Sequence, residues 1–364
     1  MRKLLVLILF LVFLGFFVFS IAKDKVRQDL ARPIAYPTAT IEPAAQKFSI
    51  TNKKETESLF VPYWTIKQDT RLPSNFDQFI YFGITPGNDG IDRSEPGFLH
   101  LADFASRVPA HKQTLLALRM IDQDTNFALL KDPHTQQAVI VQTIAVAREH
   151  GFDGIMLDLE VSAIPFDSLI KQITSFTTVF SQEAKKNKLT FSLTMYGDVF
   201  YRLRPFDVQA LSQQTDTIMI MAYDFSKAKG NPGPNFPLHG SETYGYDLAK
   251  MTDDFLRVVP PEKLTVIFGH FGYDWIVDGQ GKALQQGKAL TEQEIEKKFI
   301  QQCQYRECRV RRDTVSAETA IHYTDDAGVK HSIWFEDAQS VAAKKTYLKE
   351  RGITSFSSWA YSYF

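Results

Sequence analysis

From about Ser58 to the C-terminus, short apolar runs alternate with longer stretches whose apolar residues recur at helical spacing. Repeated βαβ units, in which a helix connects two parallel strands, give this alternation. The apolar runs predict eight strands, at Leu59–Trp64, Gln78–Ile84, Thr114–Leu118, Gly154–Glu160, Leu189–Met195, Thr217–Tyr223, Leu264–Gly269 and Ile353–Trp359. The amphipathic stretches predict helices at Pro133–His150, Phe166–Asn187, Pro205–Gln213 and Tyr246–Val258. Eight such strands can close a barrel, so the pattern predicts an α/β chain with a (β/α)8 TIM-barrel fold over residues 58–364.

One connection breaks the regular spacing. Between the seventh and eighth strands the chain is too long for a single helix and its return. This connection contains a charged helical stretch at Thr291–Gln301 and two strand-like runs at Ala320–Tyr323 and His331–Phe335, which an Asp-Asp-Ala-Gly turn separates. We therefore predict a small α+β insertion at about residues 276–337, on the rim at the carboxyl end of the barrel.

The N-terminal residues 1–22 contain an almost uninterrupted apolar run, Leu4–Ala22, after two basic residues. A helix that crosses a bilayer needs about 20 residues, whereas the apolar core of a signal peptide has about 7–15. The run therefore predicts a signal anchor, and the small residues at Ser20–Ala22 keep a cleaved signal peptide as the alternative. Residues 23–57, with prolines and no apolar period, predict an extended tether. Both alternatives predict an exported barrel, either membrane-anchored on the extracytoplasmic side through residues 4–22 or secreted.

Composition and charge narrow the function classes. The 364 residues are 44% hydrophobic and 13% aromatic, which is typical of an ordered globular chain. Lys and Arg number 41 against 42 Asp and Glu, and the predicted soluble part has no dense basic run, so we expect no nucleic-acid partner. Only two cysteines occur, Cys303 and Cys308, which are too few for a four-cysteine zinc site or a disulfide framework. They predict either free thiols or one local bridge, and we expect no cofactor.

The most informative stretch is Gly151–Glu160, where a buried type of strand ends in two acidic residues. Side chains two residues apart on a strand point to the same face. Met156, Asp158 and Glu160 therefore share one face, and the intervening Ile and Leu residues share the other, which helices should cover. Parallel α/β barrels have their active sites at the carboxyl ends of the strands, so the two carboxyl groups lie where chemistry is expected.

Two carboxylates that face the same way repel each other when both are ionised, so one should hold its proton to a higher pH. A protonated Glu160 beside an ionised Asp158 suits general-acid cleavage of a glycosidic bond. Phosphoryl and acyl transfer are disfavoured because the sequence has no Walker-type glycine loop, GxGxxG or GxSxG motif. Two other interpretations stay open from these residues alone: carboxylates that accept hydrogen bonds from loop amides, and magnesium ligands.

Three motifs in register resemble glycoside hydrolase family 18. Asp153–Glu160 resembles the family's fourth-strand signature, Asp-Gly-x-Asp-x-Asp-x-Glu. Met221–Asp224 is similar to its sixth-strand Met-x-Tyr-Asp, and Trp359 lies where the family has an aromatic residue on its eighth strand. The resemblance spans about residues 59–359 and implies the barrel fold that the strand pattern predicts.

The last third of the chain is similar to the bacterial spore-cortex and cell-wall N-acetylglucosaminidase branch of that family. The similar segments are Gly272–Trp275, His322–Gly328 and His331–Ala338. The resemblance implies hydrolysis of β-1,4 bonds in a polysaccharide that contains N-acetylglucosamine, with peptidoglycan favoured and chitin or N-glycans as alternatives. The family also contains non-catalytic carbohydrate-binding barrels, which commonly lack the terminal Glu of the signature, so Glu160 favours an enzyme.

The resemblance also implies roles for individual residues. Glu160 is the expected general acid and base, Asp158 orients the N-acetyl group of the sugar, and Tyr223 donates its hydroxyl to the acetamide oxygen. That oxygen is itself the nucleophile, so the configuration is retained and no metal is needed. Residues expected to bind substrate or line the cleft are Asp224, Trp359, Met221, Tyr63, Trp64, Tyr273 and Trp275. We expect a monomer.

Two positions depart from the family pattern. Met156 occupies the place of the middle Asp in the signature and should point into the barrel. Because an apolar neighbour cannot share charge with Asp158, we expect Asp158 to stay ionised. The third strand, Leu115–Arg119, lacks the Ser-x-Gly-Gly of typical chitinases, which disfavours the ordinary chitinase branch.

Overall fold

The computed structural model describes residues 54–364. The predicted anchor or signal peptide at 1–22, and all but the last residues of the predicted tether at 23–57, lie outside the described residues. None of the helices formed by residues 54–364 combines the length and the apolar character that crossing a membrane requires.

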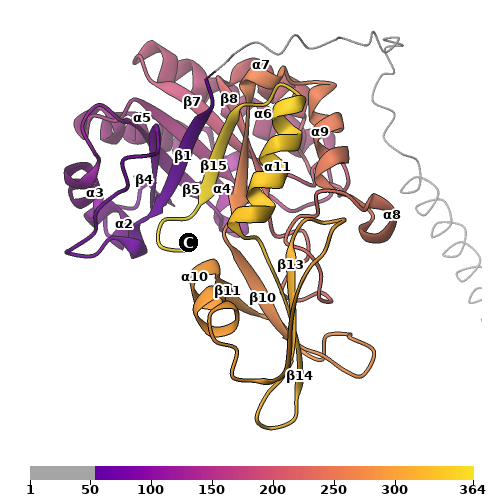
Figure 1. Cartoon of the computed structure of the whole chain (residues 1–364). Coiled ribbons are helices and arrows are strands. Elements are labelled where there is room, and N and C mark those ends of the chain that lie inside the picture. Colours follow the sequence, from indigo (N-terminus) through magenta and orange to yellow (C-terminus); the bar gives the residue numbers. More distant parts are fainter. Residues whose placement is uncertain (1–53) are drawn as a thin grey trace, which may run out of the picture. The chain divides into compact units, whose positions relative to one another are not determined.

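Eight parallel strands close into a barrel in the order β1-β15-β9-β8-β7-β6-β5-β2 (Figure 1). Their bounds are β1 Thr56–Pro62, β2 Gln78–Ile84, β5 Gln113–Met120, β6 Gly154–Leu159, β7 Thr190–Tyr196, β8 Thr217–Ala222, β9 Leu264–Gly269 and β15 Ser355–Trp359. Each overlaps a predicted strand, which confirms the predicted barrel. The first strand ends earlier than predicted because Tyr63 and Trp64 begin a short 3-10 turn, η1 (Tyr63–Thr65). A two-stranded hairpin, β3 (Pro86–Gly87) and β4 (Gly90–Ile91), follows β2.

Helices cover the outside of the barrel. They are α2 Pro96–Leu99, α3 Leu101–Arg107, α4 Gln123–Lys131, α5 Pro133–Glu149, α6 Asp167–Lys186, α7 Val208–Gln214, α8 Ser241–Tyr244, α9 Leu248–Leu256 and α11 Ala338–Glu350, with a 3-10 turn η2 at Pro261–Lys263. Two helices start later than predicted because an aspartate caps each N-terminus. Asp207 accepts a hydrogen bond from the Ala210 N–H before α7, and Asp247 accepts one from the Lys250 N–H before α9.

The two faces of the strands contribute to two separate cores. The outward face of β6, with Ile155, Leu157 and Leu159, packs in the large cluster beneath the helices. The inward face belongs to the cluster that fills the barrel, where Met156 is fully buried. Each fully buried side chain of this size stabilises the fold by roughly 1.5–3 kcal/mol. The predicted parity of β6 is therefore correct, and it brings Asp158 to the inward face.

An inserted five-stranded antiparallel sheet stands off one end of the barrel (Figure 1), in the order β11-β10-β14-β13-β12. Its elements are β10 Phe271–Ile276, β11 Lys288–Thr291, α10 Glu292–Ile295, the π-helical turn η3 Glu296–Ile300, β12 Arg306–Arg312, β13 Thr319–Thr324 and β14 Lys330–Phe335. The insertion lies between strands 7 and 8 of the barrel, as predicted. Its sheet begins at Phe271, ahead of the predicted start near residue 276, because β10 follows β9 with only His270 between them.

The insertion has a small apolar core of its own. Phe299, Ile321 and Ile333 are among its buried residues, and both cysteines pack against it. Cys303 and Cys308 form a disulfide bond, with their Cα atoms 6.4 Å apart. Of the two alternatives left open by the sequence, the structure therefore has the local bridge.

A buried ion cluster fastens α11 to the insertion. Lys344 Nζ donates hydrogen bonds to Glu318 Oε1 (2.7 Å) and Glu336 Oε2 (2.5 Å), and all three side chains are 0% exposed. Burial, together with the charge of Glu318, raises the pKa of Glu336 to about 8, although Lys344 opposes this. Burial lowers the pKa of Lys344, but the two carboxylates raise it by more, so Lys344 stays protonated.

Replacing Lys344→Met should lower the free energy of unfolding by about 3–5 kcal/mol near pH 8, because two carboxylates then stay buried without a cation. A carboxyl whose folded-state pKa lies above its unfolded value near 4.5 costs stability as pH rises through that interval, and the cost vanishes below it. The loss should therefore be smaller at pH 5 than at pH 8 in urea unfolding. Lys349→Met, which removes the exposed pair with Glu55, is the control and should cost under about 1 kcal/mol. Equal losses in the two variants would contradict this account of the cluster.

Candidate active site

A pocket of about 290 Å³ opens at the carboxyl ends of the barrel strands. Side chains from strands far apart in the sequence meet there because parallel strands end at the same rim. The lining includes polar and aromatic groups: Phe60, Trp64, Phe82, Ile121, Asp158, Glu160, Thr194, Tyr223, Asp224, Phe271, Tyr273 and Trp359. Of the ten residues predicted for catalysis or for substrate binding, Met221, Tyr63 and Trp275 are missing from this lining.

 The pocket thus brings together seven of the ten, namely Asp158, Glu160, Tyr223, Asp224, Trp359, Trp64 and Tyr273.

Asp158 is almost fully buried on the inward face of β6. The Thr194 hydroxyl on the neighbouring strand β7 donates a hydrogen bond to its Oδ1 (2.6 Å). Burial raises the pKa of Asp158 to about 7 and the charge of Glu160 adds to the rise, whereas Thr194 and Arg119 oppose it. Near neutral pH Asp158 is therefore only partly ionised, whereas we expected it to stay ionised. The reason is the burial of this carboxyl group, which is the largest cause of the raised pKa.

Glu160 is the first residue after β6, and its backbone is held on two sides. Its N–H donates to the Met120 carbonyl (2.9 Å), and its carbonyl accepts a hydrogen bond from Asn126 Nδ2 (2.9 Å). The carboxyl group accepts the Tyr196 hydroxyl at Oε2 (3.1 Å). Burial raises the pKa of Glu160, although Tyr196 and the positive charges of Lys227 and Arg204 counteract it. A fixed carboxyl group with a raised pKa is suited to donate a proton in mildly acidic or neutral solution.

Tyr223 and Trp359 form an aromatic wall in the same pocket as the carboxyl groups. Their rings are nearly parallel, with centroids 6.4 Å apart and an interplanar angle of 22°. Burial, reinforced by the charges of Asp158 and Glu160, raises the pKa of Tyr223 well above its usual value. The Tyr223 hydroxyl therefore keeps its proton and can act as a hydrogen-bond donor.

Asp224 adopts a left-handed backbone conformation, with φ at 57°. Its N–H donates to Asn235 Oδ1 (2.6 Å), and its Oδ1 accepts the Tyr273 hydroxyl of β10 (2.6 Å). Burial raises the pKa of Asp224, although the Tyr273 hydroxyl opposes this rise. The inserted sheet thus supplies one of the groups that orient a residue of the pocket.

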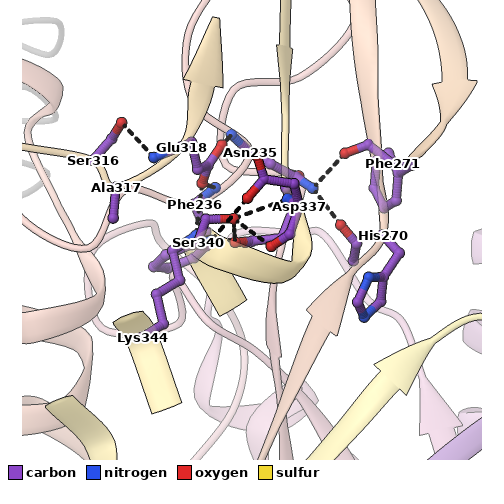
Figure 2. A network of polar contacts seen from close by, with 12 residues as sticks. Asn235, Phe236, His270, Phe271, Ser316, Ala317, Glu318, Asp337, Ser340 and Lys344 are labelled. Atoms are coloured by element: carbon purple, nitrogen blue, oxygen red, sulfur yellow. Dashed lines mark hydrogen bonds and ion pairs between the residues drawn. The ribbon is translucent and has the colours of Figure 1, made fainter. Parts of the chain in front are cut away.

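Asn235 links three strand ends near the pocket, a role that the sequence did not indicate. Its Oδ1 accepts the Asp224 N–H after β8, and its Nδ2 donates to the carbonyls of Gly269 (2.9 Å) and Phe271 (3.1 Å). Its own N–H donates to Glu318 Oε2 (2.5 Å). Because Glu318 also accepts a hydrogen bond from Lys344, Asn235 is linked through Glu318 to the buried ion cluster (Figure 2). The cluster that fastens α11 therefore also supports the loop that carries Asp224.

A second pocket of about 290 Å³ adjoins the first and shares Ile121, Glu160, Tyr223 and Asp224 with it. The residues that line only the second pocket are Gln123, Ser162, Tyr196, Gly197, Asp198, Arg204, Met221, Lys227 and Phe236. The two pockets form one cleft with Glu160 at the junction. The predicted binding residue Met221 belongs to this second part.

The sequence over residues 59–363 matches the family described as glycosyl hydrolases family 18. The chain belongs to glycosyl hydrolase family 18. The family resemblance inferred from the strand motifs is thereby confirmed, and the closed barrel agrees with it.

Among known proteins, the chain is similar to the cortical fragment-lytic enzyme of Bacillus anthracis, with 24% identity over 77% of this chain and 63% of that enzyme. It therefore spans less than two thirds of the length of this relative. It is also 24% identical to a class V chitinase of Arabidopsis thaliana, over 73% of each chain.

Two solved structures share the fold of this family 18 chain. The spore cortex-lytic enzyme SleL of Bacillus cereus has a TM-score of 0.68 and 20% identity, covering 86% of this chain and 72% of that one. A family 18 chitinase from Cycas revoluta in complex with (GlcNAc)3 has a TM-score of 0.71 and 22% identity, covering 84% of this chain and 94% of that one. At these identities the likeness shows the fold.

Two aromatic residues predicted to line the cleft lie outside both pockets. Tyr63 packs beneath the rim, where its ring contacts Trp64 (centroids 5.1 Å apart) and the Arg119 guanidinium. Trp275 is 0% exposed, and its Nε1 donates to the Ala228 carbonyl (3.0 Å). Trp275 therefore anchors the loop after β8 instead of forming a wall for substrate. Trp64, in contrast, lines the first pocket and is 46% exposed.

Acidic residues at the opposite, amino-terminal end of the barrel are structural. Asp153 Oδ2 accepts a hydrogen bond from the Thr114 N–H (2.8 Å), which ties the start of β6 to β5. It lines a cavity of about 270 Å³ there, away from Glu160. Within residues 54–364, no group of three or more His, Cys, Asp or Glu side chains is arranged to hold a metal ion.

Replacing Thr194→Val should raise the pKa of Asp158 by about one unit, because it removes a hydrogen bond that favours the ionised form. The carboxyl signal of Asp158, assigned with an Asp158→Asn variant, can be followed by 13C NMR as pH is varied. Thr194→Ser keeps the hydroxyl and should titrate like the unmodified chain. An unchanged Asp158 titration in the valine variant would show that Thr194 does not set this pKa.

Proposed function

We propose that this family 18 chain is a retaining glycosidase that hydrolyses β-1,4 bonds next to N-acetylglucosamine, with peptidoglycan as the favoured polymer. The observation that carries the proposal is the pair of carboxyl groups in the cleft, Asp158 and Glu160, which line one pocket together with Tyr223 and the flat ring of Trp359. The raised pKa of Glu160 supplies a proton donor, and the aromatic wall offers a face for a pyranose ring.

In the proposed first step, the acetamide oxygen of the bound sugar attacks its own anomeric carbon. Glu160 donates its proton to the glycosidic oxygen as that bond breaks, which leaves an oxazolinium ion and a free leaving saccharide. Asp158 holds the acetamide N–H, and the Tyr223 hydroxyl donates to the acetamide oxygen. Because burial keeps Tyr223 protonated, this donor is present throughout the working pH range.

In the second step, water opens the oxazolinium ion from the opposite face. Glu160, now ionised, accepts a proton from that water and returns to its starting form, so the anomeric configuration is retained. The pair of Asp158 and Glu160 shares its protons, and its two apparent pKa values belong to the pair. Activity should therefore fall on both sides of an optimum, as the pair gains or loses one proton.

Peptidoglycan is favoured over chitin because the sequence similarity includes cortical fragment-lytic enzymes of Bacillus. The similarity to chitinases keeps chitin oligomers as the second candidate substrate.

We also propose that the protein is exported, anchored through residues 4–22 or secreted after cleavage. The disulfide between Cys303 and Cys308 supports this, because disulfides persist in oxidising compartments.

Replacing Glu160→Gln should lower kcat by about 10²- to 10⁴-fold, the usual contribution of a general acid and base. The measurement is the release of reducing sugar from purified peptidoglycan and from chitin, with products identified by mass spectrometry. Glu183→Gln, on the outer helix α6, is the matched control and should retain activity. Undiminished release by Glu160→Gln would contradict the proposal. Glycan binding by the unmodified chain in calorimetry, without any product, would favour a carbohydrate-binding barrel instead.

A further inference from the structure

The two parts of the cleft differ in chemistry. Asp158 and Trp359 line only the first pocket, whose other side chains are mainly aromatic. Arg204 and Lys227 line only the second pocket. In the proposed function, Glu160 donates a proton to the glycosidic oxygen, so the leaving saccharide lies on the side of Glu160 away from the acetamide. The second pocket is therefore where the leaving saccharide binds.

Most of the charges near this second pocket neutralise each other. Asp198, which is buried, accepts hydrogen bonds from Arg204 Nε (2.8 Å) and Arg202 Nη1 (2.5 Å). Lys227, in contrast, is an exposed lysine that lines the pocket and forms none of the salt bridges among residues 54–364, although its charge lowers the pKa of Glu160 and of Asp224. A cation at a binding surface that forms no salt bridge within the protein is available to an anionic group of a ligand.

The backbone around Lys227 is fixed by several hydrogen bonds. Its carbonyl accepts the Gly230 N–H (2.7 Å), which closes a tight turn. The next carbonyl, of Ala228, accepts both Trp275 Nε1 (3.0 Å) and the Gly287 N–H (2.8 Å) of the insertion. The insertion thus holds the loop in place, so the ammonium group needs to order only its own side chain when it meets a ligand.

We infer that Lys227 binds a carboxylate carried by the leaving saccharide, so the substrate is an alternating glycan in which N-acetylglucosamine precedes a carboxylated sugar such as N-acetylmuramic acid. The inference rests on the proposed function and narrows its substrate class. Chitin has no charge at this position and would leave Lys227 without a partner. The lactyl carboxylate of peptide-free peptidoglycan strands supplies one.

The experiment compares kcat/KM of the full-length chain on two substrates that differ only in the charge of their lactyl groups. One is a peptide-free tetrasaccharide of alternating N-acetylglucosamine and N-acetylmuramic acid, and the other is its carboxylate methyl ester. The unmodified chain should prefer the free acid by about three- to tenfold at low salt, as expected for a partly solvated charge pair. Lys227→Gln should reduce this ratio to near one, and Lys227→Arg should keep most of it.

The ratio of kcat/KM on the two substrates distinguishes binding of the carboxylate by Lys227 from an effect of Lys227 on the catalytic acid, Glu160. The charge of Lys227 also lowers the pKa of Glu160, but that effect acts equally on both substrates and leaves the ratio unchanged. Lys229→Gln, an exposed lysine of the same loop that lines neither pocket of the cleft, is the control and should keep the ratio.

Each remaining outcome overturns a defined part of the account. Equal rates on the two substrates with the unmodified chain, or an unchanged ratio in Lys227→Gln, would overturn the role of Lys227 and leave the glycosidase proposal intact. If the chain cleaved neither tetrasaccharide and no chitin oligomer in a Glu160-dependent manner, the proposed function would be overturned, and this inference with it.

Discussion

Asp158 and Glu160 are two residues apart at the end of one buried strand, and both face the inside of the barrel rim. Burial disfavours the charge on each, and the charge of Glu160 raises the pKa of Asp158 further, so the pair holds protons to a higher pH than free carboxyl groups do. The groups around the pair moderate this effect without abolishing it. Thr194 and Tyr196, both on β7, each donate one hydroxyl to one of the two carboxyl groups.

The rest of the molecule places sugar-binding groups around this pair. Tyr223 and Asp224 follow β8, and the backbone of Asp224 is held by Asn235. The inserted sheet contributes the Tyr273 hydroxyl to Asp224, and it also fastens the loop that carries Lys227. The insertion is therefore part of the cleft. Its attachment to the barrel depends on the same buried ion cluster that supports Asn235 (Figure 2).

Much of the barrel could be predicted from the sequence because each strand is a short apolar run between amphipathic helices. The inward direction of Asp158 followed from the two-residue period of a strand. Asn235 could not be predicted, because its partner Glu318 is 83 residues away in the chain and only the folded structure brings them together. Trp275 was misjudged because an aromatic residue beside a cleft and one beneath a loop give the same sequence signal. The pKa of Asp158 depends on burial, which the sequence does not measure.

In the proposed mechanism the nucleophile belongs to the substrate, and the acid is Glu160. The most direct test compares turnover of two oligosaccharides that differ only in the N-acetyl group of the sugar at the cleaved bond. The account predicts that the acetylated oligosaccharide is hydrolysed with retention of configuration and that its deacetylated counterpart is not hydrolysed, although both carry the same glycosidic bond. Comparable turnover of the two would contradict the account.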